Sequence, residues 1–200
     1  MFHVKRDKLF VRYLDCLKEW NRNINLVQED TLDDFFNRHI EDSLQIQKFL
    51  NKDDCIIDIG AGAGFPGAVL SICEFNNVIL CEKSTKKCAF LYDLKEKLEL
   101  SYKIFNNDIV SLKTPSGACS DLVVVARAFG ELKKLLDIMS CLGVSRGVFH
   151  KGKNFKNEIE KAKMEFNFDC RIEKSTTNLD GVILIVNNVR KRDGNNNFDS

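Results

Sequence analysis

Hydrophobic residues near the amino terminus recur with the period of an α-helix. They fall, with charged residues between them, at Leu9, Phe10, Tyr13, Leu17 and Trp20. Apolar residues spaced three and four apart share one face of a helix, so this pattern predicts an amphipathic helix of about five turns. Three asparagines within residues 21–25 follow the stripe and favour a turn.

A second apolar stripe with helical spacing follows this break. It consists of Leu32, Phe35, Phe36, Ile40 and Leu44. Thr31 directly precedes the stripe, and Asp33 and Asp34 fall in its first turn. A threonine can cap the first amides of a helix, and carboxylates there oppose the helix dipole. We therefore expect a second helix after Thr31, and a helical extension that covers residues 1–50.

From residue 55 onward, short apolar runs alternate with helical patterns. Strands are expected at residues 55–59, 78–82, 102–108, 121–129, 147–152, 169–175 and 181–187. The first run, CIIDI, is nearly continuous in apolar residues, which is typical of a strand buried on both faces. Helical patterns between the earlier runs predict βαβ units and a mainly parallel sheet. No helix separates the last two runs, which favours an antiparallel pair at one edge.

The expected architecture is therefore α/β, with a main domain at residues 51–189 after the helical extension. The last residues, 190–200, read RKRDGNNNFDS and are polar and rich in asparagine. A segment of this composition cannot bury enough apolar surface to order itself, so we expect a disordered tail.

Composition and charge change this picture little. The 200 residues include 30 basic and 29 acidic ones, and the formal net charge of +1 is no global nucleic-acid signature. A nucleic-acid partner would have to meet a local patch, or itself carry protein. No apolar stretch approaches the roughly 18–20 residues of a membrane span. We therefore expect a cytoplasmic protein with no membrane partner, and by default a monomer.

The cysteines argue against a metal site. Eight are spread along the chain, at Cys16, Cys55, Cys73, Cys81, Cys88, Cys119, Cys141 and Cys170. No pair is spaced as C-x-x-C and no histidine pair lies nearby, so the sequence predicts no zinc. Several cysteines fall inside apolar runs. We expect buried free thiols in a reducing compartment, and no disulfide framework.

Candidate chemistry begins at the turn DIGAGAGFPG, which starts at Asp58 and follows the first expected strand. Glycines permit positive φ and the close approach of a ligand, and the free amides of such a turn attract anions. The pattern Gly62-x-Gly64-x-x-Gly67 matches the dinucleotide fingerprint. Asp58 followed by Gly60, Gly62 and Gly64 matches instead the turn that binds S-adenosylmethionine.

The charge of Asp58 favours the second interpretation. A dinucleotide brings a doubly negative pyrophosphate to this turn, which a carboxylate would repel. S-adenosylmethionine has no phosphate and carries ammonium and sulfonium groups, which a carboxylate attracts. Glu82 ends the second expected strand, where ribose hydroxyls of either cofactor would lie. Asp108 ends the third, and is either an adenine-side group or only a turn residue.

Five segments, in order, resemble one known family. They are WNRNINLVQ (20–28), RHIEDSL (38–44), IIDIGAGAGFPG (56–67), VARAF (125–129) and FHKG (149–152). They resemble the W-N-x-x-x-N-L-T, R-H-I-x-D-S, cofactor-turn, S-R-A-F and Y-x-L-K-G elements of the small-subunit ribosomal RNA guanine-N7 methyltransferases of the RsmG/GidB type. The resemblance covers residues 20 to about 185. It departs at Val27, where the family often has threonine, and at the missing leucine before Lys151.

This resemblance implies a class I S-adenosylmethionine-dependent methyltransferase fold, with a Rossmann-like, mainly parallel sheet of seven strands. It implies transfer of a methyl group from the cofactor S-adenosyl-L-methionine to N7 of a guanine. That guanine belongs to the decoding-region loop of 16S ribosomal RNA, the expected partner, as naked RNA or within the small ribosomal subunit. The resemblance places these residues at the cofactor, beside Asp58, Gly62, Gly64 and Asp108: Gly60, Phe65, Glu82, Ile109, Val110 and Arg127.

The expected mechanism needs no general base. The three histidines, His3, His39 and His150, share no motif with a serine or cysteine. Guanine N7 carries a free lone pair and no proton, so in-line positioning of the two reactants suffices. We therefore predict no catalytic side chain, with Arg127 and Lys151 as candidates for orienting the substrate.

Four basic residues are candidates for RNA contact: Arg38, His39, Arg127 and Lys151. Arg127 ends a buried strand, at the edge where ligands of open α/β sheets bind. Its alternative role is a structural salt bridge with Asp42 or Asp58. For the other candidates the alternative is a solvent-facing surface charge.

Three other functions stay open. One is a nicotinamide-dependent oxidoreductase, against which the charge of Asp58 argues. Another is a non-catalytic ribosome assembly factor, against which the intact cofactor turn argues. The third is a methyltransferase that acts on a different RNA base, which composition does not exclude.

Overall fold

The computed structural model describes residues 2–113 and 121–192. Within them one sheet contains β1 (Cys55–Ile59), β2 (Val78–Cys81), β3 (Lys103–Phe105), β4 (Leu122–Arg127), β5 (Arg146–Lys151), β6 (Phe166–Lys174) and β7 (Val182–Lys191). The helices are α1 (Phe2–Asn21), the single turn α2 (Asp42–Leu44), α3 (Gly67–Ile72), α4 (Thr85–Leu98), α5 (Leu132–Leu142) and α6 (Phe155–Lys163).

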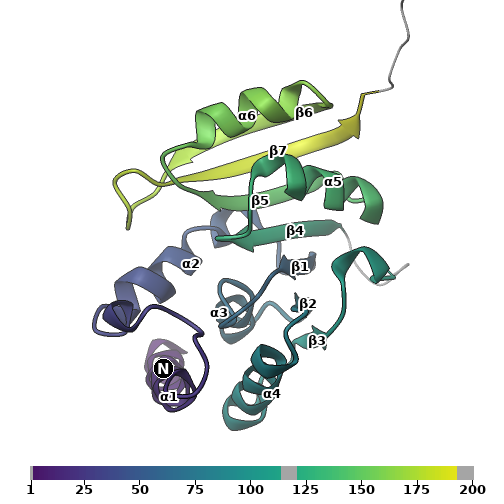
Figure 1. Ribbon diagram of the computed structural model, residues 1–200. Helices are drawn as coiled ribbons and strands as arrows, with labels where there is room; N and C mark the ends of the chain where they lie inside the picture. The colour runs from purple at the N-terminus through teal and green to yellow at the C-terminus, as the bar shows by residue number, and fades with distance from the viewer. Residues whose placement is uncertain (1, 114–120, 193–200) are drawn as a thin grey trace, which may run out of the picture.

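The strand order across the sheet is β3-β2-β1-β4-β5-β7-β6, and Figure 1 shows it from β3 at the bottom to β6 at the top. The first five strands are parallel, whereas β7 runs antiparallel to both β5 and β6. Both expectations from the sequence, the mainly parallel sheet and the antiparallel edge pair, are confirmed. The order reverses at β1, which lies between β2 and β4. Ligands of open α/β sheets bind at the carboxyl ends of strands beside such a switch point.

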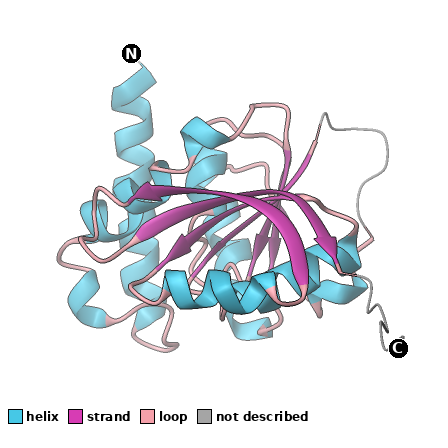
Figure 2. Cartoon of the chain, turned by 90° about the horizontal axis from the view of Figure 1, so that it is seen from above, coloured by secondary structure: helices cyan, strands magenta, loops and turns pink. Residues whose placement is uncertain are grey.

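Helices cover both faces of the twisted sheet (Figure 2). One hydrophobic cluster joins α1, α3 and α4 to one face, and a second joins α5 and α6 to the other. Alternate residues of β4 divide between them, because Val123 and Val125 belong to the first cluster and Val124 to the second. Burial on both faces explains why the strand sequences are nearly continuous in apolar residues.

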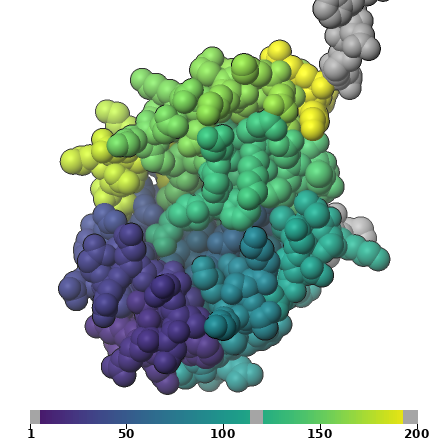
Figure 3. Space-filling view, viewed as in Figure 1, coloured from purple at the N-terminus to yellow at the C-terminus, as the bar shows by residue number. Residues whose placement is uncertain are grey.

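The amino-terminal helix packs against the same core as the sheet. Phe10, Tyr13 and Leu17 of α1 are buried in the first cluster, together with Phe90 and Leu94 of α4. In Figure 3 the purple amino-terminal residues and the teal residues of α4 form one continuous surface. The helical stripe predicted from the sequence therefore faces the core.

The second predicted helix differs from expectation in form. A short 3₁₀ helix, Glu29–Thr31, ends where the helix was expected to begin. The chain then forms a π-helix, Phe36–Glu41, which continues into α2. Thr31 does not cap the helix, because its hydroxyl donates to the carbonyl of Gln28 and contacts the ring of His39. Tertiary contacts of the Thr31 and His39 side chains thus replace the predicted cap.

The structure also tests the expectations for the cysteines, the carboxy-terminal tail and membrane-spanning helices. Among the described cysteines, four are buried free thiols as expected: Cys16, Cys73, Cys81 and Cys88. Two further free thiols differ from the expectation, because Cys141 is exposed and Cys170 is half-buried. Cys55 is disulfide-bonded, which corrects the expectation for that position. β7 continues to Lys191, which corrects the expectation of a disordered tail for Arg190 and Lys191. Residues 193–200 of the expected tail lie outside the described residues, as does Cys119. Within the described ranges, no helix is both long and apolar enough to cross a membrane.

Candidate active site

The turn after β1 is built on glycines with positive φ. The φ angles of Gly60, Gly62 and Gly64 are +70°, +55° and +88°, a region that other residues rarely adopt. A Cβ at Gly60 would lie 2.3 Å from Cδ2 of Phe129, and one at Gly64 would lie 2.6 Å from the hydroxyl of Tyr13. At Gly62 it would meet only the carbonyl oxygen of Gly60, at 3.7 Å. Gly62 is therefore the position at which a ligand can approach the backbone.

Asp58 lies buried beside this turn. Its Oδ2 accepts a hydrogen bond from the amide of Gly67 at 2.8 Å, whereas its buried Oδ1 has no hydrogen-bond partner in the protein. Burial raises the pKa of Asp58 to about 7; the Gly67 amide and Arg127 oppose this shift, and Glu82 adds to it. Buried polar atoms are nearly always paired. The free Oδ1 therefore fits a site that receives a donor from a ligand.

Glu82 directly follows β2 and places a carboxylate against the same turn. Its Oε2 accepts from the amide of Gly62 at 3.1 Å, and its Oε1 accepts from the amide of Ser84 at 2.8 Å. The two amides fix the orientation of the side chain. The structure thus brings together Asp58, Glu82 and the glycines, which the sequence placed in one site.

Phe65 lies within an aromatic stack. Its ring is 4% exposed and stacks on Tyr13 and His39, with centroid distances of 5.2 and 4.7 Å. The hydroxyl of Tyr13 donates to the carbonyl of Ala63 at 2.5 Å. Side chains from α1 and from the π-helix thus hold the turn in place. This arrangement favours a role for the Phe65 ring in fixing the turn over direct contact with a cofactor.

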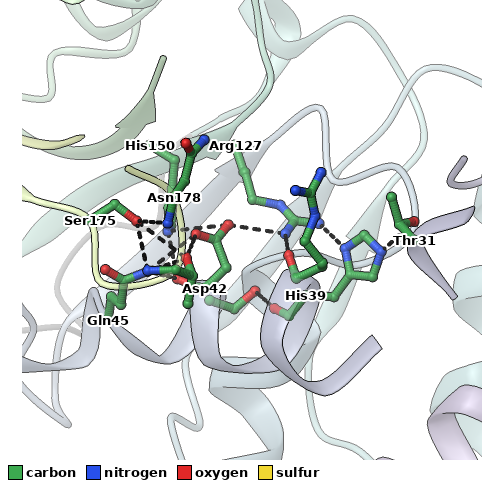
Figure 4. Close-up of polar contacts among 11 residues, drawn as sticks. Thr31, His39, Asp42, Gln45, Arg127, His150, Ser175 and Asn178 are labelled. Atoms are coloured by element: carbon green, nitrogen blue, oxygen red, sulfur yellow. Dashed lines mark hydrogen bonds and ion pairs between the residues drawn. The ribbon is translucent and has the colours of Figure 1, made fainter. Parts of the chain in front are cut away.

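Arg127, at the end of β4, joins several groups (Figure 4). Its Nη1 donates to Oδ2 of Asp42 at 3.2 Å and to the carbonyl of Arg38 at 3.0 Å. Its Nη2 donates to Nδ1 of His39 at 3.0 Å, and its guanidinium carbon lies 4.7 Å from the ring centroid of Phe65. The salt bridge with Asp42, one alternative left open by the sequence, is therefore present. It joins two side chains that are 16% and 17% exposed.

His39 is buried, whereas the alternative to RNA contact predicted from the sequence was a solvent-facing position on a helix. Because Nδ1 accepts from Arg127, the ring proton resides on Nε2, which donates to Oγ1 of Thr31 at 2.9 Å. Burial and the charge of Arg127 lower the pKa of His39 to about 4, so the ring is neutral near pH 7. With both nitrogens engaged, this placement favours positioning of Arg127 over direct contact with RNA.

Asp42 connects this network to a distant turn. Its Oδ1 accepts from the hydroxyl of Thr177 at 2.7 Å and from Nε2 of Gln45 at 3.2 Å. Gln45 also accepts from the amide of Thr176 at 2.7 Å. The turn between β6 and β7 is thereby tied to α2, as Figure 4 shows. The sequence contained Asp42 within RHIEDSL and as a possible partner for Arg127. Its contact with Thr177 could not be predicted, because residues 135 positions apart leave no local signal.

Lys151, at the end of β5, is buried and paired. Its Nζ lies 2.6 Å from both the carbonyl of Gly130 and Oε2 of Glu158. The same Glu158 oxygen accepts from the amide of Leu132, at the start of α5. Lys151 thus fixes the segment between β4 and α5. This position favours a supporting role over the surface contact with RNA that the sequence allowed.

The remaining predicted residues lie at the rim of this edge. The Arg38 side chain is exposed and stays a candidate for RNA contact. After β3, the carboxylate of Asp108 accepts from the amide of Val110 at 3.2 Å and starts the 3₁₀ helix Ile109–Ser111. Asp108 and Val110 are exposed, whereas Ile109 is half-buried. They lie at the carboxyl end of β3, the edge that carries the glycine turn.

A cavity of about 200 Å³ lies at the carboxyl ends of β4 and β5. Its lining includes Asp42, Arg127, His150, Lys151, Asn178 and Gly181. A cavity of about 600 Å³ lies at the opposite ends of the strands, beside α1 and the residues that precede β2 and β3. Its lining contains none of the residues predicted for the site, whereas Arg127 and Lys151 line the smaller cavity.

Sequence comparison connects this arrangement with one family. The family model of the rRNA small subunit methyltransferase G matches residues 6–185. A "Ribosomal RNA small subunit methyltransferase G" of Rickettsia typhi is 38% identical over 179 residues, which cover 88% of this chain and 91% of the relative. One from Orientia tsutsugamushi (strain Ikeda) is 37% identical and covers 92% and 93%.

Solved structures show the same fold at low sequence identity. A mutant of MtNAS in complex with S-adenosylmethionine has a TM-score of 0.59 and 13% identity, covering 94% of this chain and 77% of that one. A SAM-dependent methyltransferase from Aquifex aeolicus has a TM-score of 0.56 and 14% identity, covering 79% and 95%. These likenesses establish the methyltransferase type of α/β fold.

Proposed function

Because the chain belongs to the ribosomal RNA small subunit methyltransferase G family, we propose that it transfers a methyl group from S-adenosylmethionine to N7 of a guanine in 16S ribosomal RNA. The family match over residues 6–185 carries this proposal. We propose the decoding-region loop as the target and the small ribosomal subunit as its setting. The near-zero net charge supports presentation of the RNA with ribosomal protein.

The residues of the turn fit the cofactor. Gly62 leaves space beside the backbone, Asp58 offers a buried oxygen without a donor, and Glu82 is held at the end of β2. Asp58 would attract the ammonium group, the turn amides would bind the carboxylate, and Glu82 would accept from the ribose hydroxyls. The cofactor, when bound, supplies an electrophilic methyl group. The protein supplies its position and the surrounding charges.

The acceptor needs no base, and the described residues fit that requirement. N7 of guanine attacks the methyl carbon with its own lone pair, so no proton has to leave it. The two described histidine rings near the site are His39, which is buried, and His150, which is largely buried, and desolvation lowers the pKa of each. Both nitrogens of His39 are engaged, and Nε2 of His150 donates to the carbonyl of Asp42 at 2.7 Å. Alignment of the reactants is then the main source of rate enhancement.

The charges at this edge suit a cationic product. Methylation at N7 leaves the guanine ring with a positive charge, which an unpaired cation nearby would oppose. Arg127 is paired with Asp42, and Lys151 with Glu158. Each cation at the carboxyl ends of β4 and β5 is thus offset by a carboxylate. The pairing supports a site that orients the base without repelling the product.

Asp58 is expected to make stability depend on pH. An aspartate in an unfolded chain has a pKa of about 3.9, whereas that of folded Asp58 is about 7. The free energy of unfolding that this group contributes is therefore fully present below pH ~4 and is lost as pH rises to ~7, by a few kcal/mol at most. Urea unfolding at several pH values should show this loss in the wild type and not in Asp58→Asn. Identical pH profiles for the two proteins would contradict the assigned pKa.

Cofactor binding should then release a proton. An ammonium group beside Asp58 favours its ionised form, so S-adenosylhomocysteine should displace the proton near and below pH ~7, where Asp58 is still protonated in the free protein. Calorimetry in buffers of different ionisation enthalpy measures this release. Asp58→Asn is the matched control, and equal proton release from it would remove Asp58 from the ammonium site.

Methyl transfer itself tests the proposed function. The protein is incubated with labelled S-adenosylmethionine and either 16S RNA or small subunits from cells that lack it. Label in N7-methylguanine is expected. Label in another base would identify the closer rival, a methyltransferase with a different target. Binding of NAD without methyl transfer would indicate an oxidoreductase, and RNA binding without transfer would indicate an assembly factor.

A further inference from the structure

The cavity of about 200 Å³ beside Arg127 is lined by no residue of the cofactor turn, residues 58–67. It lies at the carboxyl ends of β4 and β5, on the other side of the switch point from β2 and β3. The glycine turn and Glu82 occupy the β1 and β2 side. A reactant seated in the cavity would therefore lie at the same edge of the sheet as the cofactor turn and beside it, as a two-substrate reaction requires.

The size of the cavity suits one nucleobase. Pockets for drug-sized ligands measure about 300–1,000 Å³, so a cavity of about 200 Å³ fits a smaller, planar group. Enzymes that modify a base commonly swing it out of its stack into such a pocket, where its Watson–Crick edge is read.

The charges of the lining favour a base over a phosphate. A phosphate site needs uncompensated positive charge or several free amides. Here Arg127 is paired with Asp42 at 3.2 Å, and Lys151 with Glu158 at 2.6 Å. The lining therefore offers polar groups without a net positive charge, which suits a neutral ring that becomes cationic.

Asp42 retains one acceptor position. An ionised carboxylate offers about four lone-pair sites. Protein donors use three of them, from Arg127 at 3.2 Å, Thr177 at 2.7 Å and Gln45 at 3.2 Å. The side chain is 17% exposed and lines the cavity. These contacts hold the carboxylate in one orientation while leaving it able to accept from a ligand.

We propose that this cavity receives the target guanine and that Asp42 accepts a hydrogen bond from its exocyclic 2-amino group. The amino group and N7 lie at opposite ends of the purine, so this contact directs N7 away from the Asp42 wall. Adenine lacks the 2-amino group, and the contact therefore also discriminates between the purines. Asp42 would thus determine specificity for guanine. This assignment rests on the proposed function, the methylation of guanine N7 in 16S ribosomal RNA.

Inosine tests the contact, because it differs from guanosine only in lacking the 2-amino group. Single-turnover methylation is measured on small subunits reconstituted with guanine or inosine at the target position. The wild type should prefer guanine by roughly tenfold or more, since a hydrogen bond to a charged group is lost with inosine. Asp42→Asn should reduce this preference to near unity. An unchanged preference in Asp42→Asn would overturn the proposal.

Thr177→Val is the matched control, because it removes a donor to Asp42 and keeps the carboxylate. Its guanine preference should persist even where its rate falls. If Asp42→Asn is too slow to assay, the binding of nucleosides to the wild type tests the proposal instead. Guanosine or inosine is titrated into the wild type in the presence of saturating S-adenosylhomocysteine. NMR shifts are expected at the amides of Ala128, Gly152 and Gly181, and weaker ones with inosine. No shifts there, or equal shifts with both nucleosides, would overturn the proposal.

The failures of the two proposals are distinguishable. A wild type that methylates neither substrate would contradict the proposed function, and with it the base contact. An active wild type that shows no preference between guanine and inosine would contradict only the assignment of the cavity.

Discussion

Gly62→Val is expected to weaken S-adenosylhomocysteine binding by at least about 100-fold, close to 3 kcal/mol, while the sheet stays folded. A Cβ at this position meets only the carbonyl oxygen of Gly60, at 3.7 Å, so the protein leaves room for a Cβ there. The space that valine fills is the space through which a ligand reaches the turn. Calorimetric titration of the variant with S-adenosylhomocysteine measures the loss.

Gly143→Val provides the matched control for backbone strain. Gly143 ends α5 with φ +68°, close to the +55° of Gly62, and a Cβ there meets no atom within 4 Å. Both variants should lose roughly 1–2 kcal/mol of stability from the left-handed backbone. Only Gly62→Val should lose cofactor affinity. Equal affinities in the two variants would contradict the assignment of the turn.

Arg127→Ala is expected to reduce methyl transfer by at least about 100-fold, since the loss of a part-buried ion pair leaves its carboxylate unpaired. Arg127 joins Asp42, the carbonyl of Arg38 and the ring of His39, and lines the cavity beside the turn. Removing it frees all three partners at once. Single-turnover methylation of 16S RNA or small subunits measures the effect.

Arg146→Ala separates a local effect from a general loss of stability. Arg146 pairs with the buried Asp54 at 3.1 Å, a salt bridge of similar burial at the opposite end of β5. The Arg146→Ala variant should lose at least as much stability as Arg127→Ala. Its rate of methylation per folded molecule should nevertheless stay unchanged. Comparable losses of activity in both variants would indicate that Arg127 acts only through stability.

The fold could be predicted from the sequence because its signals are local. Buried parallel strands need continuous apolar runs, and CIIDI and LVVV have them. The absence of a helix between the last two strands was enough to predict their antiparallel pairing. The form of the second helix could not be predicted, since the side chains of Thr31 and His39 bond to each other across the segment.

The residues on the cofactor side of the site could also be predicted from the sequence. Asp58, the glycines and Glu82 each follow a strand closely, and parallel strands bring their carboxyl ends together. Their common site follows from connectivity alone. The free Oδ1 of Asp58 and the space at Gly62 then agree with the chemistry inferred from their charges.

The residues on the side of the site that would bind the guanine were harder to predict from the sequence. Arg38, His39, Arg127 and Lys151 looked alike as basic residues, but the structure pairs Arg127 and Lys151 with carboxylates and buries His39. Asp42 acquires its importance from contacts with β4 and with the turn after β6. Such pairings depend on segments far apart in the chain, which composition and periodicity do not reveal.

The proposed activity of the protein is methylation of one guanine of 16S ribosomal RNA at N7. The most direct measurement is a mass-spectrometric map of methylated nucleotides in 16S RNA from cells with and without the protein. We expect a single N7-methylguanine, in the decoding-region loop, that is present with the protein and absent without it. Identical maps from the two sources would contradict the claim.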